Sequence, residues 1–280
     1  GAKMPPARRL MHGLRPNRFK AALASSLPQI GLWACACSPL ATEAVAHSGI
    51  DWLCIDMEHA PNGVGSVLHQ LHAVQASTAQ PVVRVPGELD VALVKRLLDI
   101  GVQSLLFPMV ESAEQAAATV ASTRYPPHGV RGVMSTMRAT AYATDAEELR
   151  EYYTSATDEL AVVVQVESIS AARDAVAIGR VKGIDGVFIG PADLAASMGH
   201  MGRPDHPEVQ HEIRRTIHAC VSAGVPVGIF TNEAAVPDFL QAGASFIAVG
   251  TEIGLLASSS RAIAHRFRGT VSSIRMTPTM

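Results

Sequence analysis

Two carboxylates and an imidazole stand together in the first third of the chain. Asp56, Glu58 and His59 follow the apolar residues 52–55 and precede a Pro-Asn turn. A buried strand that ends here would hold these side chains rigidly, while the loop after it meets solvent. Proton transfer requires acids and bases that are both fixed and reachable. The cluster therefore indicates a reactive site, although it names no reaction by itself.

Two further carboxylates, Glu167 and Asp193, each follow a separate apolar run. If these runs are neighbouring strands, the two side chains converge as the ligands of a hard divalent cation do. The alternative is structural, because each acid can instead pair with an Arg or cap a following helix. Gln165 is two residues before Glu167 and so faces the same side of a strand, either as a donor to substrate or as a satisfied core amide.

Arg84 and His59 both need partners of opposite charge. A permanently charged guanidinium inside an apolar run requires an anion, which is a protein carboxylate, a substrate carboxylate or a developing enolate. A general-base imidazole requires a carboxylate that sets its pKa, and Asp56, Glu58 and Asp99 are the candidates. Asp99 ends a predicted helix, where an acid opposes the helix dipole, and this indicates a specific partner.

The chain lacks the residues that Schiff-base chemistry and phosphate binding require. The chain has only four lysines, and none falls at the end of a predicted strand, which argues against a Schiff-base mechanism. The last apolar run ends in a single glycine, Gly250, followed closely by the acidic Glu252. This arrangement does not form a phosphate cradle, so phosphorylated substrates are not expected.

Eight short runs rich in Val, Ile and Leu predict the strands that position these residues. They cover residues 30–35, 52–56, 82–85, 104–108, 161–166, 186–189, 227–230 and 246–249. Most are continuously apolar, as in parallel strands that are covered on both faces. Segments with helical periodicity lie at 64–77, 90–100, 112–122, 146–156, 170–178, 207–223, 234–242 and 253–267.

This end-to-end alternation favours one α/β domain, a single (β/α)8 TIM barrel, over a doubly wound sheet with an added domain. We expect the barrel to span residues 17–268, between a mobile N-terminal tail (1–16) and a C-terminal tail (269–280). In a barrel of this kind, chemistry occurs at the C-terminal ends of the strands, which is where the polar residues above fall. The long interval 123–159 is expected to form a wall of the active site.

Composition excludes some partners. The 280 residues carry a net charge of -2 with a pI near 6.6, so no electrostatic footprint for nucleic acid is present. The apolar runs are much shorter than the roughly 20 residues that a membrane-spanning helix needs, and we expect a cytoplasmic protein. Cys35, Cys37, Cys54 and Cys220 are expected to be free thiols, and packing is favoured over a soft-metal site at the first two.

Several motifs together resemble the HpcH/HpaI family of metal-dependent, class II 2-oxo-acid aldolases. In chain order they are D-M-E-H-A-P-N (56–62), P-V-V-R (81–84), L-D-I-G (98–101), Y-P-P (125–127) with R-G (131–132), Q-V-E (165–167) and G-V-F-I-G-P-A-D-L (186–194). The match runs in unbroken order over about residues 17–267. Met57 and Met134 depart from the pattern, since many relatives have glycine there, and this concerns the aldehyde preference.

The resemblance implies a barrel that reversibly cleaves 4-hydroxy-2-oxo acids, such as 4-hydroxy-2-oxoheptanedioate from aromatic catabolism, into pyruvate and an aldehyde. The cofactor would be Mg²⁺, or else Mn²⁺ or Co²⁺, with Glu167 and Asp193 as the metal ligands. A metal that chelates the 2-oxo acid can act as a Lewis acid on the pyruvate enolate that forms when the C3–C4 bond breaks. The family also implies a homo-oligomer, a trimer or a hexamer, in which subunits exchange a terminal helix.

The remaining roles follow from the same resemblance. Arg84 would stabilise the enolate, and His59 would be the base, made more basic by Asp99. Asp56 and Glu58 would hold metal-bound water or orient the imidazole. Pyruvate would be held by the following residues: Gln165, Gly190, Pro191, Ala192 and Asp193.

Two alternative functions stay open at this point. A related barrel lyase that acts on malyl-CoA or citryl-CoA uses similar enolate chemistry, although the chain shows no basic patch for the CoA diphosphate. A non-catalytic barrel that serves as a binding module is the other alternative.

Overall fold

Eight parallel strands close into one barrel in the computed structural model, which describes residues 15–87 and 89–275, the last six as backbone only. The strands pair in sequence order and β8 pairs with β1, as predicted. Their bounds are β1 Gln29–Ala34, β2 Trp52–Asp56, β3 Gln80–Arg84, β4 Ser104–Phe107, β5 Ala161–Val166, β6 Gly186–Ile189, β7 Val227–Thr231 and β8 Phe246–Thr251. The expected (β/α)8 barrel is therefore confirmed.

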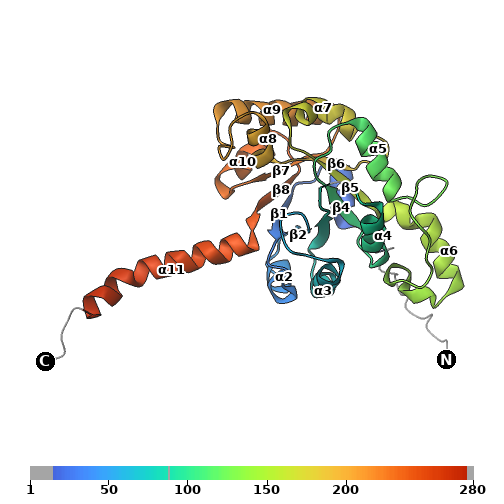
Figure 1. Ribbon diagram of the computed structural model, residues 1–280, viewed down its shortest axis with the longest axis horizontal. Helices are drawn as coiled ribbons and strands as arrows, with labels where there is room; N and C mark the ends of the chain where they lie inside the picture. Colours follow the sequence, from blue (N-terminus) through green and yellow to red (C-terminus); the bar gives the residue numbers. More distant parts are fainter. Residues whose placement is uncertain (1–14, 88, 276–280) are drawn as a thin grey trace.

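Helices surround the strands (Figure 1). The α-helices are α2 Pro39–Ala46, α3 Val64–Val74, α4 Val91–Asp99, α5 Ala113–Ser122, α6 Ala146–Ser155, α7 Ile169–Gly179, α8 Pro191–Ser197, α9 Pro207–Ser222, α10 Val236–Gln241 and α11 Glu252–Arg275, with 3-10 turns η2 Arg138–Ala143, η3 Ala156–Glu159 and η4 Glu233–Ala235. The side chains of Asp90 and Ser112 cap α4 and α5 by accepting hydrogen bonds from first-turn amides. Gly101 and Gly243 follow helices with φ of 93° and 99°, a conformation that glycine adopts without strain.

A short helix that the periodicity did not reveal, α1 Arg18–Ala24, closes the N-terminal end of the barrel. Its Phe19 ring lies 5.5 Å from the Trp52 ring and 5.8 Å from the Phe246 ring, centroid to centroid. These side chains belong to a cluster inside the barrel, separate from the larger apolar layer between strands and helices. Large aromatic side chains thus fill the interior at the N-terminal end of the barrel. The polar residues lie at the opposite end, where the strands have their C-terminal ends.

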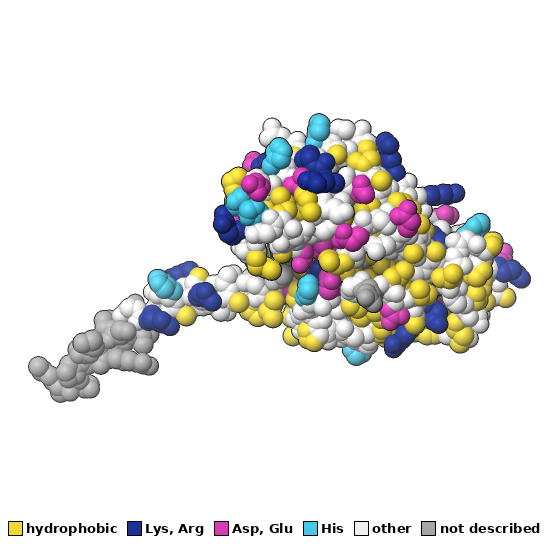
Figure 2. Space-filling model, turned by 45° about the horizontal axis from the view of Figure 1, so that its top comes forward, with side chains coloured by type: hydrophobic (Ala, Val, Ile, Leu, Met, Phe, Trp, Pro, Cys, Tyr) yellow, Lys and Arg dark blue, Asp and Glu magenta, His cyan; other side chains and the backbone are white. Residues whose placement is uncertain are grey.

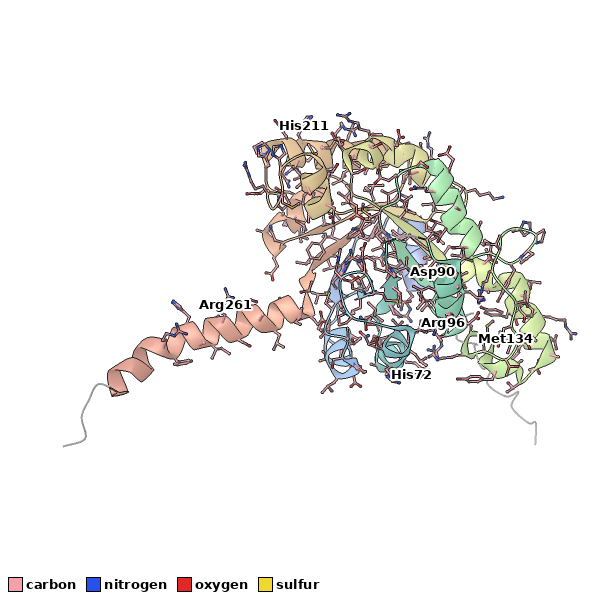
Figure 3. All side chains as sticks on the ribbon, viewed as in Figure 1. His72, Asp90, Arg96, Met134, His211 and Arg261 are labelled. Atoms are coloured by element: carbon pink, nitrogen blue, oxygen red, sulfur yellow. The ribbon has the colours of Figure 1, made fainter. Side chains whose placement is uncertain are left out.

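The interval 123–159 leads from the end of α5 to the start of β5, so it begins and ends at the N-terminal face of the barrel. Arg131 is buried here, with its guanidinium 4.5 Å from the Tyr125 ring centroid and in a hydrogen bond with Tyr152. Figure 3 shows Met134 in the same outlying region, near α6. The expectation that this interval walls the chain's own active site is wrong, because strand C-terminal ends face the opposite way.

Helix α11 leaves the barrel and projects away from it (Figure 1). It continues to Arg275, beyond the predicted end at residue 267 and into the predicted C-terminal tail. The predicted N-terminal tail lies outside the described residues, apart from positions 15 and 16. Within the described part of the chain, no helix is both long and apolar enough to cross a membrane. The four cysteines are free, as expected.

Candidate active site

The C-terminal ends of β2 and β3 bring Asp56 and Arg84 side by side. The two residues are partners in the strand register. Asp56 shares the parity of Trp52 and Cys54, both in the interior cluster, and Arg84 shares the parity of Val82, which is in the same cluster. The alternation of strand side chains therefore directs both charged groups into the mouth of the barrel.

Arg84 is bound by two carboxylates of its own chain. Its Nε and one terminal nitrogen each lie 2.8 Å from an oxygen of Asp56, and its other terminal nitrogen lies 2.9 Å from Glu58 Oε2. Burial tends to lower the pKa of the Arg84 guanidinium, but the hydrogen bonds to Asp56 and the nearby charges, including those of Asp56 and Glu58, together outweigh this and raise it. The anion that Arg84 requires is thus a protein carboxylate. One N–H on each terminal nitrogen remains for a further acceptor.

His59 lies at the rim of this cluster. Its Nε2 is 3.8 Å from Glu58 Oε2, and its side chain is 68% exposed. Burial raises the pKa of Glu58, while the charges of Arg84 and His59 act to lower it. The imidazole is therefore open to a ligand that enters the mouth, with Glu58 as its nearest paired carboxylate.

Glu167 is a buried carboxylate at the end of β5, with 3% exposure. It accepts hydrogen bonds from the amide of Met109 (2.8 Å) and from the side-chain amide of Gln165, which confirms that the Gln165 and Glu167 side chains lie on the same side of the chain. Burial raises its pKa to about 7, and the negative charges of Asp193 and Glu58 add to the effect. Gln165 Oε1 is buried without a hydrogen-bond partner among the described residues.

A glycine allows the β6 end to approach these groups. A Cβ at Gly190 would lie 2.5 Å from Glu167 Oε2 and 2.7 Å from Gln165 Nε2, so any side chain there would displace them. Gly190 is the N-cap of α8 and Pro191 occupies the first turn, which also contains Asp193. The exposed Asp193 side chain makes no hydrogen bond or ion pair within the described residues. The segment predicted to hold pyruvate, from Gly190 through Pro191 and Ala192 to Asp193, therefore begins directly against Glu167 and Gln165.

The donor set fits a hard divalent cation. Within residues 15–87 and 89–269, no Lys, Arg or His side chain pairs with Glu167 or Asp193, whereas Arg84 is already bound elsewhere. Their charges are close enough for one to raise the pKa of the other. Two such carboxylates beside an unsatisfied amide oxygen are oxygen donors of the kind that Mg²⁺ prefers. The structural alternative fails for Glu167, which neither pairs with an Arg nor caps a helix.

Comparison with known proteins agrees with this geometry. A model of the HpcH/HpaI aldolase/citrate lyase family matches residues 29–259. The chain belongs to this family. It is 49% identical over 254 residues to a hydroxypyruvate/pyruvate aldolase from Cupriavidus necator, covering 90% of this chain and 93% of the relative. It is also 42% identical to a 5-keto-4-deoxy-D-glucarate aldolase from Klebsiella pneumoniae, covering 90% of this chain and 97% of the relative.

A solved structure supports the same assignment. A HpcH/HpaI aldolase/citrate lyase family protein from Burkholderia cenocepacia superposes with a TM-score of 0.85 at 42% identity, over 90% of this chain and 99% of that chain. The chain is accordingly a carbon–carbon lyase of the aldolase type, and the resemblance drawn from its motifs is confirmed.

In this HpcH/HpaI aldolase, Asp99 does not lie beside His59. Helices of the barrel run antiparallel to the strands, so the C-terminal end of α4 lies at the face opposite to the strand ends. Asp99 Oδ1 instead pairs with the buried Arg131 at 3.0 Å. The specific partner of Asp99 is thus an arginine. The pairing of Asp99 with His59 that the family resemblance implies does not occur within one chain, and it stays a prediction.

Glu252 is a residue of the mouth that the sequence interpretation missed. Its carboxylate accepts hydrogen bonds from the amides of Cys35 and Ala36, at 2.6 to 2.9 Å, and so fixes the loop after β1. The signal was available, since Glu252 directly follows β8, at the same face as the other acids. Met109 was also missed: its φ of 54° directs its amide to Glu167, and no sequence pattern predicts this.

Proposed function

We propose that this aldolase cleaves 4-hydroxy-2-oxo acids to pyruvate and an aldehyde, and catalyses the reverse addition, with a divalent ion such as Mg²⁺, Mn²⁺ or Co²⁺. One observation carries the proposal. Glu167 and Asp193 are carboxylates at the mouth with no cationic partner among the described residues, while Arg84 is held by Asp56 and Glu58. A buried carboxylate without a counter-charge is costly unless a cation is bound in the working state.

Glu167 and Asp193 would hold the ion. When bound, it would supply Lewis-acid chemistry to the oxygens of the 2-oxo acid. Gln165 Oε1, which has no partner within the described residues, would accept a hydrogen bond from water or from substrate beside it. The amide end of the same side chain keeps Glu167 in place.

His59 would start the cleavage as the general base. It removes the proton from the C4 hydroxyl group, and the C3–C4 bond then breaks, so that the aldehyde forms and the electron pair passes into the C2–C3 enolate. The remaining N–H groups of Arg84 donate to the enolate oxygen, where negative charge develops. Protonation at C3 gives pyruvate. Glu58, 3.8 Å from His59 Nε2, stabilises the imidazolium between these steps.

The 2-oxo-acid half of the substrate is better supported than the aldehyde half. The relatives that match most of this chain are named for hydroxypyruvate, pyruvate and a keto-deoxy sugar acid. We therefore propose pyruvate or hydroxypyruvate as the nucleophilic half. The 4-hydroxy-2-oxoheptanedioate of aromatic catabolism is then one member of a panel of possible substrates.

Helix α11 supports a homo-oligomer, a trimer or a hexamer. Ile253, Leu256, Ile263 and Phe267 are 47%, 68%, 56% and 52% exposed, and their spacing places them on one face of the helix. Figure 2 shows hydrophobic side chains gathered where α11 leaves the barrel. An apolar stripe on a projecting helix of about 36 Å would bury itself against another subunit.

The test is a panel of 4-hydroxy-2-oxo acids and CoA esters, in which pyruvate or acyl product is followed with and without a chelator. We expect metal-dependent pyruvate release from at least one 4-hydroxy-2-oxo acid. Cleavage restricted to CoA esters would replace this proposal with a CoA-ester lyase, and binding without cleavage of any compound would favour the binding module.

A further inference from the structure

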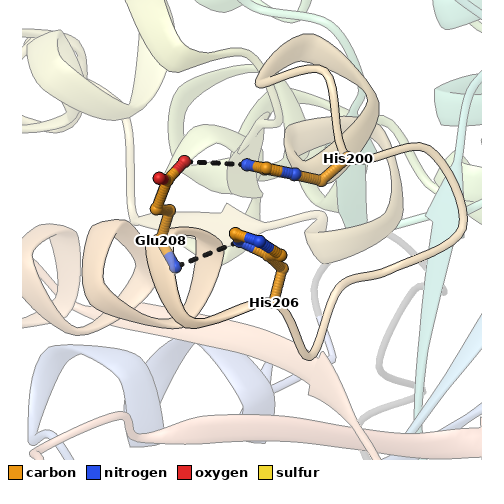
Figure 4. A group of neighbouring side chains, drawn as sticks. All are labelled: His200, His206 and Glu208. Carbon is orange, nitrogen blue, oxygen red and sulfur yellow. Dashed lines mark hydrogen bonds and ion pairs between the residues drawn. The ribbon is translucent and has the colours of Figure 1, made fainter.

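Two histidines and a glutamate converge on the connection between α8 and α9. His200 Nε2 lies 2.8 Å from Glu208 Oε2, and the rings of His200 and His206 stack with centroids 3.6 Å apart (Figure 4). One donor atom of each residue lies within 4.8 Å of the other two. Among the described residues, no other group of three His, Cys, Asp or Glu side chains has this spacing.

The backbone fixes this cluster in place. The amide of His200 donates to Ala195 O at 2.7 Å, and the amide of His206 donates to Arg203 O at 3.0 Å. Gly199 and Gly202 adopt φ of 81° and 71°, a conformation that turns the chain back without strain only because they lack a Cβ. The two histidines are therefore held by the loop itself and not by chance side-chain contact.

Each of the three side chains offers one donor atom to the cluster. Nδ1 of His206 accepts the amide N–H of Glu208 at 3.3 Å, so this nitrogen carries no proton, and its lone pair would be transferred from the amide to a bound ion. The hydrogen bond between His200 Nε2 and Glu208 Oε2 places one proton between two of the ligand atoms, and metal binding would release this proton. The Glu208 side chain is 70% exposed and that of His200 is 19% exposed, so solvent reaches the cluster.

We infer that His200, His206 and Glu208 form a second metal site, which takes a borderline transition-metal ion, Zn²⁺ being the best match. Two imidazoles and one carboxylate are a common zinc donor set, with water in the fourth position. At a Zn–N distance of about 2.0–2.1 Å, tetrahedral donors lie about 3.3 Å apart, so donor atoms that now lie within 4.8 Å of one another need to close by at most about 1.5 Å. Mg²⁺, which prefers oxygen donors, would select Glu167 and Asp193 instead.

The position of the site suggests what the ion does. It would tie the loop after α8 to the first turn of α9, and α8 itself begins with the segment Pro191–Asp193 of the candidate active site. A ligand that binds only the folded state raises the melting temperature by mass action. The second site would therefore stabilise this part of the barrel without contacting the substrate.

The test uses Zn²⁺ as the probe and the full-length Glu167→Gln/Asp193→Asn variant, in which the first site is removed. Equilibrium dialysis should show one Zn²⁺ per chain, and adding His200→Gln or His206→Asn should weaken binding by about tenfold or more. His206→Asn keeps a good helix cap, so the variant should fold, which circular dichroism checks. His211→Asn, an exposed histidine on α9 (Figure 3), is the matched control and should leave Zn²⁺ binding unchanged.

Two further readouts separate this site from the cysteines. Co²⁺ in place of Zn²⁺ should give visible bands without a thiolate charge-transfer band, and Zn²⁺ should raise the melting temperature only while His200 and His206 are intact. The inference is overturned if the variant that lacks the first site binds no Zn²⁺ at about 100 μM, far above the dissociation constant of a built zinc site. It is equally overturned if the histidine substitutions leave the affinity unchanged.

Discussion

Arg84 donates two hydrogen bonds of 2.8 Å to the two carboxylate oxygens of Asp56, directly across the register of β2 and β3. The pair is buried, and the guanidinium also lies 5.4 Å from the Trp33 ring centroid. This fork geometry fixes the plane of the guanidinium, so its unused N–H groups point in a defined direction. The orientation of Arg84, and not only its charge, is therefore part of the proposed mechanism.

Arg84→Lys should lower kcat/KM for pyruvate release by about 10²–10³-fold, because lysine keeps the charge but loses the fork. Steady-state kinetics on the best substrate measures the change. Arg214→Lys is the matched control, since Arg214 lies on α9 and makes an exposed 3.8 Å pair with Asp238 and a cation–π contact with Phe239. Equal losses in both variants would contradict the role of Arg84 geometry.

Asp56→Ala should lower the free energy of unfolding by about 3–5 kcal/mol, because it leaves the buried Arg84 charge without its main partner. Urea denaturation at pH 7 measures this. A loss of less than about 1 kcal/mol, as expected for an exposed pair, would show that Arg84 is compensated in another way.

The stability of the metal-free protein should fall as pH rises. The pKa of Glu167 is about 7 in the folded state, above its ordinary 4.5, so the folded state binds more protons than the unfolded state between these values. Stability is therefore lost as pH increases from about 4.5 to about 7. Urea midpoints in a chelator across this range should decline for the wild type more steeply than for Glu167→Gln, and parallel curves would contradict the assignment.

The affinity for Mg²⁺ should also depend on protonation of Glu167, but it should rise as pH increases. A carboxylate ligand must be ionised, so Mg²⁺ affinity should fall by about tenfold per pH unit below the Glu167 pKa. Calorimetric titration of Mg²⁺ with pyruvate present, at several pH values, measures this. Affinity that is flat across that range would argue against Glu167 as a ligand.

Gly190→Ala should reduce activity by about tenfold or more with little change in melting temperature, because the added Cβ displaces Glu167 and Gln165 at the mouth and not in the apolar core. Gly65→Ala is the control, since a Cβ at this α3 position meets nothing within 4 Å. If Gly190→Ala retained full activity, the close packing of these groups would not matter for catalysis.

The oligomer should depend on the apolar face of α11. Leu256→Asp combined with Phe267→Asp should shift the protein to a smaller species in light scattering, because two buried charges are costly at an interface. Ser258→Asp, on the opposite face of the same helix, should leave the mass unchanged. A wild-type protein that is monomeric at micromolar concentration would refute the proposed assembly.

The spacing of apolar residues and the order of the predicted strands and helices along the chain were sufficient to predict the barrel. Continuous apolar runs and helical periodicity predict strands and helices because both depend on the local sequence. The same logic placed Asp56, Arg84, Gln165 and Glu167 at one mouth, since strand parity and strand ends are readable from sequence. Helix α1 was missed because it packs through only two buried side chains, Phe19 and Leu23.

The pairing of charged side chains could not be predicted in the same way. Three acids were candidates for His59, and only the fold shows that Asp99 lies at the far face beside Arg131. Such partners are distant in sequence, so no local pattern encodes them. The contact between the Met109 amide and Glu167 depends on a positive φ at Met109. Residues other than glycine rarely adopt a positive φ, so the residue type does not predict this contact.

The most direct test of the central claim is exchange of the pyruvate methyl protons for deuterium, followed by NMR in D₂O with no aldehyde present. Enolate formation requires only the 2-oxo-acid half of the site, so the result does not depend on the unknown aldehyde. We predict rapid exchange with wild-type protein and Mg²⁺, and background exchange after chelation or with Glu167→Gln/Asp193→Asn. Exchange that continues at the wild-type rate in the chelated protein or in that variant would contradict a metal-dependent enolate at Glu167 and Asp193.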